Sequence, residues 1–344
     1  MAHAAPSIRE TPDLSIGGDD RWRGRLRSAL GWTISGALIV IILARVDGAA
    51  ALQALLGAAP VPVLVALGLV VLEVVLRARR WQILLGFERP VPYRSAATYL
   101  CIGYFANTLL PARLGDVARA YLTGRDLRIP RLATFGTILV ERTADAGLIV
   151  IAVLGLSQLT PAAGAFSVPA LVLLLAGVAG GLVGLTVLLA WRSGRIHPPR
   201  MVARGLILLD RIMMGARALR SPGRLAAVTI LTIAAFAVAI VEFWVISGAV
   251  GVPIGLFEAG IVMGVLALST SVPAAPGSVG TYELAGVAIM TQLGADPALA
   301  LAAVVLMHVI ATLPPALAGL IAFTRLQIRV TDLRSPAPLE PTLA

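Results

Sequence analysis

Long apolar segments alternate with short polar ones along the chain. Six of the apolar segments have the length of a membrane-spanning helix, which needs about 17–25 mainly apolar residues. They lie at 29–45, 61–80, 132–158, 168–191, 225–250 and 298–323. This pattern predicts an all-α integral membrane protein.

Two further apolar regions, 96–122 and 257–292, are interrupted near their middle. The first breaks between Pro111 and Gly115, and the second breaks between Pro273 and Val279. Because the arms of the first region are shorter than a spanning helix, we predict that each region is a re-entrant helical hairpin that returns to its own side. Non-helical backbone at membrane depth is tolerated only where it is buried in protein or lines a cavity. The two breaks are therefore candidate binding regions.

The two breaks share the pattern P-A-x-x-G-x-V and occupy equivalent positions in the chain. Each follows two spanning segments and precedes one, so the repeats 29–158 and 168–323 would each contain a span, a span, a hairpin and a span. Three spans is an odd number, which inverts one repeat relative to the other. Paired interrupted segments in inverted repeats are typical of secondary transporters, with the site near the midplane. The predicted fold therefore has about six full spans plus two re-entrant hairpins. The distribution of charge fits eight to ten spans equally well, and only the short arms favour re-entrance.

Composition agrees with a membrane domain. Hydrophobic residues make up 58% of the 344 and charged residues 13%, and the mean hydropathy is +0.90, which excludes an ordinary soluble protein. We expect no separate soluble catalytic domain. Cys101 is the single cysteine, which excludes an intrachain disulfide and a cysteine-based metal cluster.

All 28 basic residues are arginines, because the chain contains no lysine. A nucleotide-binding loop of the G-x-x-x-x-G-K-[ST] type is therefore absent from this sequence, and we do not expect ATP hydrolysis. The arginines lie between apolar segments, which favours contact with anionic lipid over binding of nucleic acid.

The arginines also predict the orientation in the membrane. The loops near 46–60, 159–167, 251–256 and 293–297 hold no arginine, whereas the opposite connections are rich in it. By the positive-inside rule, both termini are cytoplasmic in an inner (cytoplasmic) membrane. The polar tail 1–28 lacks the early apolar core of a secretory signal, so we expect the first apolar segment to remain as an anchor. Residues 29–325 form the membrane domain, and 326–344 form a second cytoplasmic tail.

Glu141, Arg142 and Asp145 lie inside an apolar segment, on one arc of the predicted helix. A charge at this depth costs about 2.5–3.5 kcal/mol on insertion scales, so we expect the three side chains to face the first hairpin rather than lipid. The alternative is a structural role, in which Arg142 forms an internal ion pair with Asp145 or Glu141.

Arg113 and Arg119 are the main candidates for ligand binding, because a guanidinium fork matches the oxygens of a phosphate. Glu141 and Asp145 would balance them when the site is empty. Further polar candidates near the two breaks are Asn107, Asp116 and Ser278.

Five other positions are candidates for a functional role, and most of them also have a structural interpretation. Glu283 would either offset the positive end of a helix dipole or hold a cation or proton. Glu242 and His308 are candidates for a proton relay, and His308 is alternatively a hydrogen-bonded packing residue. Arg79 and Arg80, beside Trp81, would contact lipid head groups at the interface or simply anchor the helix there.

Four stretches carry a family resemblance: Arg79-Arg80-Trp81, GYFANTLLPARLGDVARAYLTGR at 103–125, Glu141-Arg142-Thr-Ala-Asp145, and SVPAAPGSVGTYE at 271–283. In these the chain resembles the membrane domain of lysylphosphatidylglycerol synthases, the flippase-like domain family. Asp116 stands where the family usually has glutamate. The resemblance implies movement of a lipid with a charged or phosphorylated head group from the inner to the outer leaflet. The aminoacyl-transferase domain of the full-length synthases is missing, so lipid aminoacylation is not expected.

The first hypothesis is therefore a lipid translocase without a cofactor, whose ligand is a membrane phospholipid or a polyprenyl-phosphate lipid. One alternative is a membrane-embedded enzyme acting on such a lipid, although the sequence shows no metal-ligand cluster and no nucleophile paired with a base. The other is a non-transporting lipid-binding subunit that recruits a lipid-modifying partner enzyme.

Overall fold

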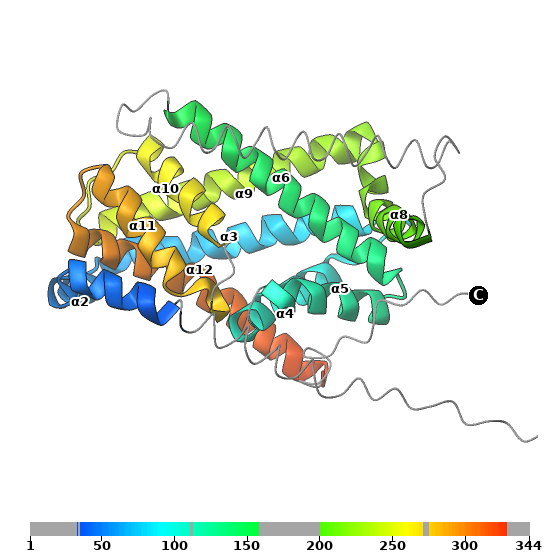
Figure 1. Ribbon diagram of the computed structural model, residues 1–344, viewed down its shortest axis with the longest axis horizontal. Coiled ribbons are helices and arrows are strands. Elements are labelled where there is room, and N and C mark those ends of the chain that lie inside the picture. The colour runs from blue at the N-terminus through cyan, green and yellow to red at the C-terminus, as the bar shows by residue number, and fades with distance from the viewer. Residues whose placement is uncertain (1–32, 34, 111–112, 158–199, 271–274, 329–344) are drawn as a thin grey trace, which may run out of the picture.

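The computed structural model of the protein describes residues 33, 35–110, 113–157, 200–270 and 275–328. Within those residues every regular element is a helix (Figure 1), which confirms the all-helical class. The predicted segments 1–28 and 168–191 lie outside the described residues, as does most of 326–344.

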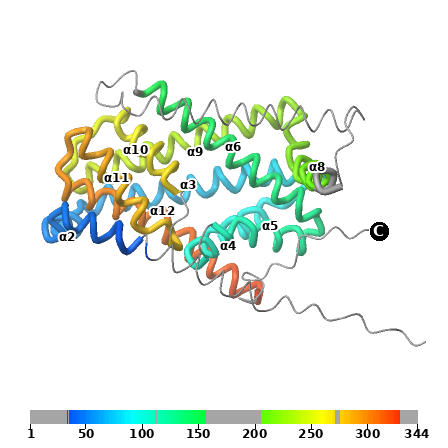
Figure 2. The backbone as a smooth tube through the Cα atoms, viewed as in Figure 1, coloured from blue at the N-terminus to red at the C-terminus, as the bar shows by residue number. Residues whose placement is uncertain are grey.

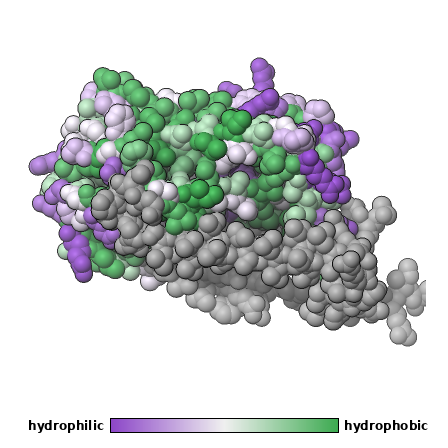
Figure 3. All heavy atoms as spheres, turned by 90° about the horizontal axis from the view of Figure 1, so that it is seen from above, coloured by the Kyte–Doolittle hydropathy of each residue, from purple (hydrophilic) through white to green (hydrophobic). Residues whose placement is uncertain are grey.

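Within the part of the chain that the structure describes, three helices are long and apolar enough to cross a membrane: α3 (Pro60–Leu85), α9 (Pro222–Ala249) and α12 (Pro297–Arg325). Each begins with a proline, whose missing N–H costs no helical hydrogen bond at that position. In the space-filling view, hydrophobic residues cover the middle of the face and hydrophilic residues gather at its two ends (Figure 3). The protein is therefore a multi-pass membrane protein.

The first predicted span differs from the structure. Helix Ser35–Arg45 bends by 92° into α2 (Gly48–Leu56), and the pair counts as a fourth candidate span only if taken together. Asp47 starts α2, because its carboxylate accepts hydrogen bonds from the N–H groups of Ala49 at 2.9 Å and Ala50 at 3.0 Å. The loop predicted at 46–60 is therefore wrong in its first part, where the chain is helical.

Helix α6 (Arg131–Ser157) matches the predicted segment 132–158. It is long enough to span, but every 18-residue stretch of it contains Glu141, Arg142 and Asp145, so it is not one of the uniformly apolar helices. The total of six full spans stays a prediction.

The two interruptions are present at the predicted positions. Helix α4 (Tyr93–Leu109) is followed by α5 (Leu114–Asp126), and α10 (Leu256–Ser269) is followed by the short 3₁₀ helix η4 (Pro276–Ser278) and by α11 (Thr281–Gln292). Figure 2 traces the two pairs in different halves of the view. Pro111 and Pro273 themselves lie outside the described residues.

Each hairpin packs against a long helix of the other half of the chain: α4 contacts α12, and α10 contacts α6. The α4–α12 contact is very close. A Cβ atom added to Gly319 on α12 would lie 2.0 Å from the carbonyl oxygen of Cys101 on α4. Glycine is therefore required where these two helices meet.

The arginine-rich connection before α9 contains regular structure of its own. Helix α8 (Arg200–Met213) continues into the 3₁₀ helix η3 (Met214–Arg220), and both pack against α6. The backbones approach closely, since a Cβ atom on Gly136 would lie 1.8 Å from the carbonyl oxygen of Ile212.

Candidate functional site

A cavity of about 1160 Å³ lies between the two hairpins. The first hairpin contributes Asn107 and Arg113 to its wall, and the second contributes Thr270 and Ser278. Apolar side chains of α3, α6, α9, α10 and α12 form much of the remaining wall. The cavity is slightly larger than the range of about 300–1,000 Å³ for ligand pockets and combines polar groups with apolar walls.

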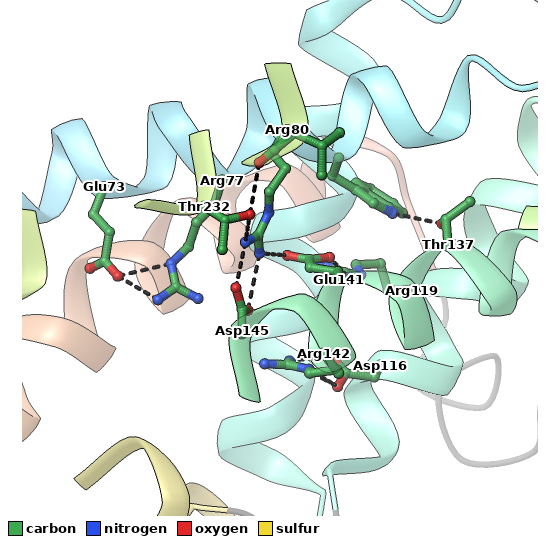
Figure 4. A network of polar contacts seen from close by, with 12 residues as sticks. Glu73, Arg77, Arg80, Asp116, Arg119, Thr137, Glu141, Arg142, Asp145 and Thr232 are labelled. Atoms are coloured by element: carbon green, nitrogen blue, oxygen red, sulfur yellow. Dashed lines mark hydrogen bonds and ion pairs between the residues drawn. The ribbon is translucent and has the colours of Figure 1, made fainter. Parts of the chain in front are cut away.

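Arg80 is the centre of a buried ionic network beside this cavity (Figure 4). Its Nη2 donates to Glu141 Oε1 at 2.8 Å and to Asp145 Oδ2 at 3.1 Å, and its Nη1 donates to Asp145 Oδ1. Nη1 also donates to the hydroxyl of Thr232 on α9 at 3.0 Å. Arg80 thus connects α3, α6 and α9.

The prediction that Arg80 contacts lipid head groups at the interface is wrong, because the side chain is only 1% exposed and faces two carboxylates. Its neighbour Arg79 points elsewhere. Arg79 is exposed and donates to the side chain of Gln82. On a helix, positions 79 and 80 lie 100° apart, so one arginine faces the helix bundle while the other does not.

Arg119 lies on the far side of Glu141 from Arg80. Its Nη2 is 2.9 Å from Glu141 Oε2, and its guanidinium carbon lies 4.3 Å from the centroid of the Trp81 ring. Trp81 in turn donates to the hydroxyl of Thr137 at 3.1 Å. Arg119 is 2% exposed and is not among the residues that line the cavity. The structure therefore places it behind the cavity wall.

Arg142 on α6 pairs with Asp116 on α5 of the first hairpin, at 2.9 Å between Nη2 and Oδ2. The predicted ion pair of Arg142 with Asp145 or Glu141 is wrong, because Arg80 binds both of those carboxylates. Asn107 extends this contact by donating to Asp116 Oδ1 at 3.4 Å.

The first hairpin closes tightly just after its break. A Cβ atom on Gly115 would lie 2.5 Å from both the carbonyl oxygen of Gly103 and Oδ1 of Asn107, so α5 touches α4 directly at this point. The glycine in the sequence pattern after Pro111 is therefore a packing requirement.

Arg113 precedes α5 in a left-handed backbone conformation, with φ 56°. Such a conformation in a residue other than glycine costs about 1–3 kcal/mol and needs support from its surroundings. Arg113 Nη2 donates to the hydroxyl of Thr270, at the end of α10, which joins the two hairpins. Ser278 in the second break has a similar backbone, with φ 60°.

The described residues of the site do not balance in charge. Each carboxylate is within ion-pair distance of an arginine, and Arg113 is the arginine that has no carboxylate at that distance. The arginines are Arg77, Arg80, Arg113, Arg119 and Arg142, and the carboxylates are Glu73, Asp116, Glu141 and Asp145. One positive charge, on the wall of the cavity, is therefore left for an anion.

The second hairpin carries a separate polar cluster. Glu283 accepts the N–H of Gly280 at 2.6 Å, which caps α11, and its other oxygen contacts His308 Nδ1. His308 Nε2 donates to the carbonyl oxygen of Gly277 at 2.9 Å. Since Nε2 holds a hydrogen, another proton lies between Nδ1 and Glu283. The structural interpretations of Glu283 and His308 thus match these contacts, and His308 also lines the cavity.

Glu242 on α9 is fully buried, at 0% exposure. Within the described part of the chain, neither of its carboxyl oxygens has a hydrogen-bond partner. Buried polar groups are almost always hydrogen-bonded, so this carboxyl requires an explanation.

The structure brings most of the predicted site residues into one region. Of these, Asn107, Arg113, Arg142, Asp145, Ser278 and His308 line the cavity, while Arg80, Asp116, Arg119, Glu141, Glu242 and Glu283 lie behind its wall. Sequence reasoning missed Glu73, Arg77, Tyr104, Thr232 and Thr270 as lining residues. Glu73 and Arg77 bond at 2.8 Å, and their spacing with Arg80 places all three on one helical face.

The family model for the lysylphosphatidylglycerol synthase TM region matches residues 28–319. The chain belongs to this family. Both hairpins and every charged residue of the network lie within the matched part of the lysylphosphatidylglycerol synthase TM region. Among curated proteins, none matches the chain. Membership of the lysylphosphatidylglycerol synthase TM family indicates a membrane protein involved in lipid modification or translocation.

Proposed function

We propose that the protein is a lipid translocase, which moves a lipid with a phosphate-containing head group from the inner to the outer leaflet. The observation that carries this proposal is the position of Arg113. It lines a large, mostly apolar cavity and has no carboxylate partner among the described residues. A lipid phosphate supplies the missing negative charge, and its acyl or polyprenyl chains suit the apolar walls.

The other arginines act through the walls of the cavity. Arg77 and Arg142 line it while remaining paired with Glu73 and Asp116, so they add positive potential without being free. Arg119 holds Glu141 in place and is a positioning residue rather than a ligand contact. From the sequence, both Arg113 and Arg119 are candidates for phosphate binding, whereas we now assign this role to Arg113 alone.

The contacts between helices support an alternating mechanism. The pairs α4–α12 and α6–α10 correspond if each repeat consists of a span, a span, a hairpin and a span. The pairs α5–α6 and α11–α12 correspond in the same way. If the two repeats are inverted and each hairpin packs against the other repeat, the same relative movement can open the cavity first to one leaflet and then to the other.

The proposal is tested with the purified protein in phosphatidylcholine vesicles, by measuring how fast a fluorescent phosphatidylglycerol reaches the opposite leaflet. Arg113→Ala removes charge-assisted hydrogen bonds worth about 1.5–3 kcal/mol, so its rate should fall by about tenfold to a hundredfold. Arg89→Ala is the matched control, because Arg89 is exposed and is not among the residues that line the cavity.

A fluorescent phosphatidylcholine measures selectivity in the same vesicles. Movement of neither lipid by the wild type would refute translocation. If anionic lipid copurifies with the protein under those conditions, as shown by mass spectrometry, the result would favour the lipid-binding subunit instead. Equal rates for wild type and Arg113→Ala would remove Arg113 from the site.

A further inference from the structure

Glu242 is the one side chain in the described residues whose carboxyl oxygens are both buried and both without a hydrogen-bond partner. It lies on α9, one helical turn from Ala239, which lines the cavity. An ionised carboxylate cannot remain in such a place without a partner, because the loss of its hydration is not compensated. A carboxyl group that holds a proton is neutral, and it removes most of this cost.

We propose that Glu242 is a proton-binding site and that lipid movement through the cavity is coupled to uptake of one proton there. The inference rests on the proposed function and adds the coupling ion to it. Its geometric basis is the burial of Glu242 beside the cavity wall, together with the charged groups that surround it.

Arg77 on α3 connects Glu242 to the ligand site. Glu242 interacts electrostatically with Arg77 and with Glu73, and both of these side chains line the cavity. A change in the charge of Glu242 therefore changes the electrostatic potential at the cavity wall that would contact the lipid.

Charged groups on the other helices that pack against α9 are paired or are not among those that act electrostatically on Glu242. On α6 the charges of Glu141, Arg142 and Asp145 are paired, and on α12 His308 is held by Glu283 of α11. Glu258 lies in the first turn of α10, and Arg217 and Arg220 on η3 lie near the start of α9. Arg77 and Glu73 are thus the groups that act on Glu242 directly.

The coupling follows from the charge of Arg77. An ionised Glu242 and a lipid phosphate are both attracted to this guanidinium, so each weakens the binding of the other. Protonation of Glu242 removes a negative charge near Arg77, so the positive potential that the paired Arg77 adds to the cavity wall attracts the phosphate more strongly, and phosphate binding in turn favours the proton. By linkage the two effects have the same size.

A proton also neutralises the cargo. One phosphate monoanion and one proton cross the bilayer together without net charge, whereas the anion alone would move with or against the membrane potential. The proton is bound by Glu242 and leaves from it, so no other reactant is required.

The first test does not depend on transport. The infrared spectrum of the purified protein should contain the C=O stretching band of a protonated carboxyl at neutral pH. Glu242→Gln should remove that band, while Glu88→Gln, at an exposed glutamate, should leave it. Size-exclusion chromatography confirms that both variants are folded. A spectrum unchanged by Glu242→Gln would mean that Glu242 is ionised and would overturn the proposal.

The second test measures coupling in phosphatidylcholine vesicles that contain a fluorescent phosphatidylglycerol. With a pH difference of one unit across the membrane, coupling to one proton should shift the ratio of the probe between the two leaflets by about tenfold. Glu242→Gln mimics the protonated carboxyl, so it should move the probe without response to the gradient. Glu88→Gln should respond as the wild type does.

The outcomes separate the two proposals. If the wild type moves the probe but the pH gradient does not change the ratio of the probe between the leaflets, the coupling is refuted and translocation stands. If the wild type moves no probe, translocation and coupling both fall, while the infrared result still decides whether Glu242 binds a proton. A Glu242→Gln variant that responds to the gradient like the wild type would assign coupling to another group and refute the inference.

Discussion

Arg80 on α3 and Glu141 on α6 form an ion pair of 2.8 Å in which neither side chain is more than 3% exposed. Glu141 is shared, because its second oxygen binds Arg119 of α5 at 2.9 Å. One carboxylate therefore fixes the positions of three helices around the cavity. We therefore expect loss of the Glu141 carboxylate to lower the free energy of unfolding more than it lowers the affinity for ligand.

Glu141→Gln should destabilise the protein strongly. The substitution leaves two buried guanidinium groups with one carboxylate fewer, and breaking a buried pair in this way costs about 3–5 kcal/mol. The midpoint of thermal or denaturant unfolding in detergent measures the effect. Glu88→Gln, at an exposed position, should change the free energy of unfolding by less than about 0.5 kcal/mol. Similar midpoints for the two variants would contradict the burial of Glu141.

Arg113 and Arg119 should respond differently to substitution by lysine. Arg119→Lys weakens the stacking on Trp81 and the contact with Glu141, so we expect a loss of stability of about 0.5–2 kcal/mol. Arg113→Lys keeps the charge but loses the fork that fits a phosphate, so we expect slower lipid movement with little change in stability.

Both quantities are measured on the same preparations, as the unfolding midpoint and as the rate of probe movement per folded molecule. The opposite pattern, a stable Arg119→Lys with slow transport and an unstable Arg113→Lys with normal transport, would exchange the roles of the two arginines.

Gly319→Ala should disrupt the packing of α4 on α12. The added methyl group would lie 2.0 Å from the carbonyl oxygen of Cys101, so the helices must separate, at a cost of about 1–3 kcal/mol for an overpacked contact. Gly68→Ala is the control on α3, because nothing lies within 4 Å of its Cβ position. The unfolding midpoint should fall for Gly319→Ala alone, and an equal response of both variants would mean that the close approach is absent.

The first hairpin should be reachable from one side of the membrane only. In a Cys101→Ser background, single cysteines at Tyr93 and Asp126, the outer ends of α4 and α5, should react with an impermeant maleimide from the same face. A cysteine at Leu114, which is next to the break and is not among the residues that line the cavity, should not react from the opposite face. Labelling of Leu114 from that face would show that the two helices cross the membrane completely.

The hairpins could be predicted from sequence because their signals are local. Proline and glycine interrupt two apolar regions, and the structure ends α4 at Leu109 and starts α5 at Leu114, close to the predicted break. The bend before α2 was missed, although Asp47 is a typical helix N-cap residue. Hydropathy indicates how long an apolar segment is, but it does not indicate a change in the direction of the helix axis within that segment.

The role of Arg80 required tertiary information. Arginines next to a tryptophan at the end of an apolar segment look the same whether they face lipid head groups or the interior. The spacing of Glu73, Arg77 and Arg80 was a usable signal, because it places three charges on one face of α3. The partners of Arg80 on α6, Glu141 and Asp145, are 61 and 65 positions away in the chain, and no local pattern indicates them.

The packing of each hairpin against a helix from the other half of the chain has a consequence for biosynthesis. Helix α4 is made early, but the surface against which it packs, α12, is made last. Until α12 inserts, the face of α4 around Cys101 has no glycine-bearing neighbour and must be sheltered by lipid or by a chaperone. The order of synthesis therefore makes packing of α12 on α4 a late folding step, and a ribosome stalled before Pro297 would leave α4 in contact with α3 but without α12.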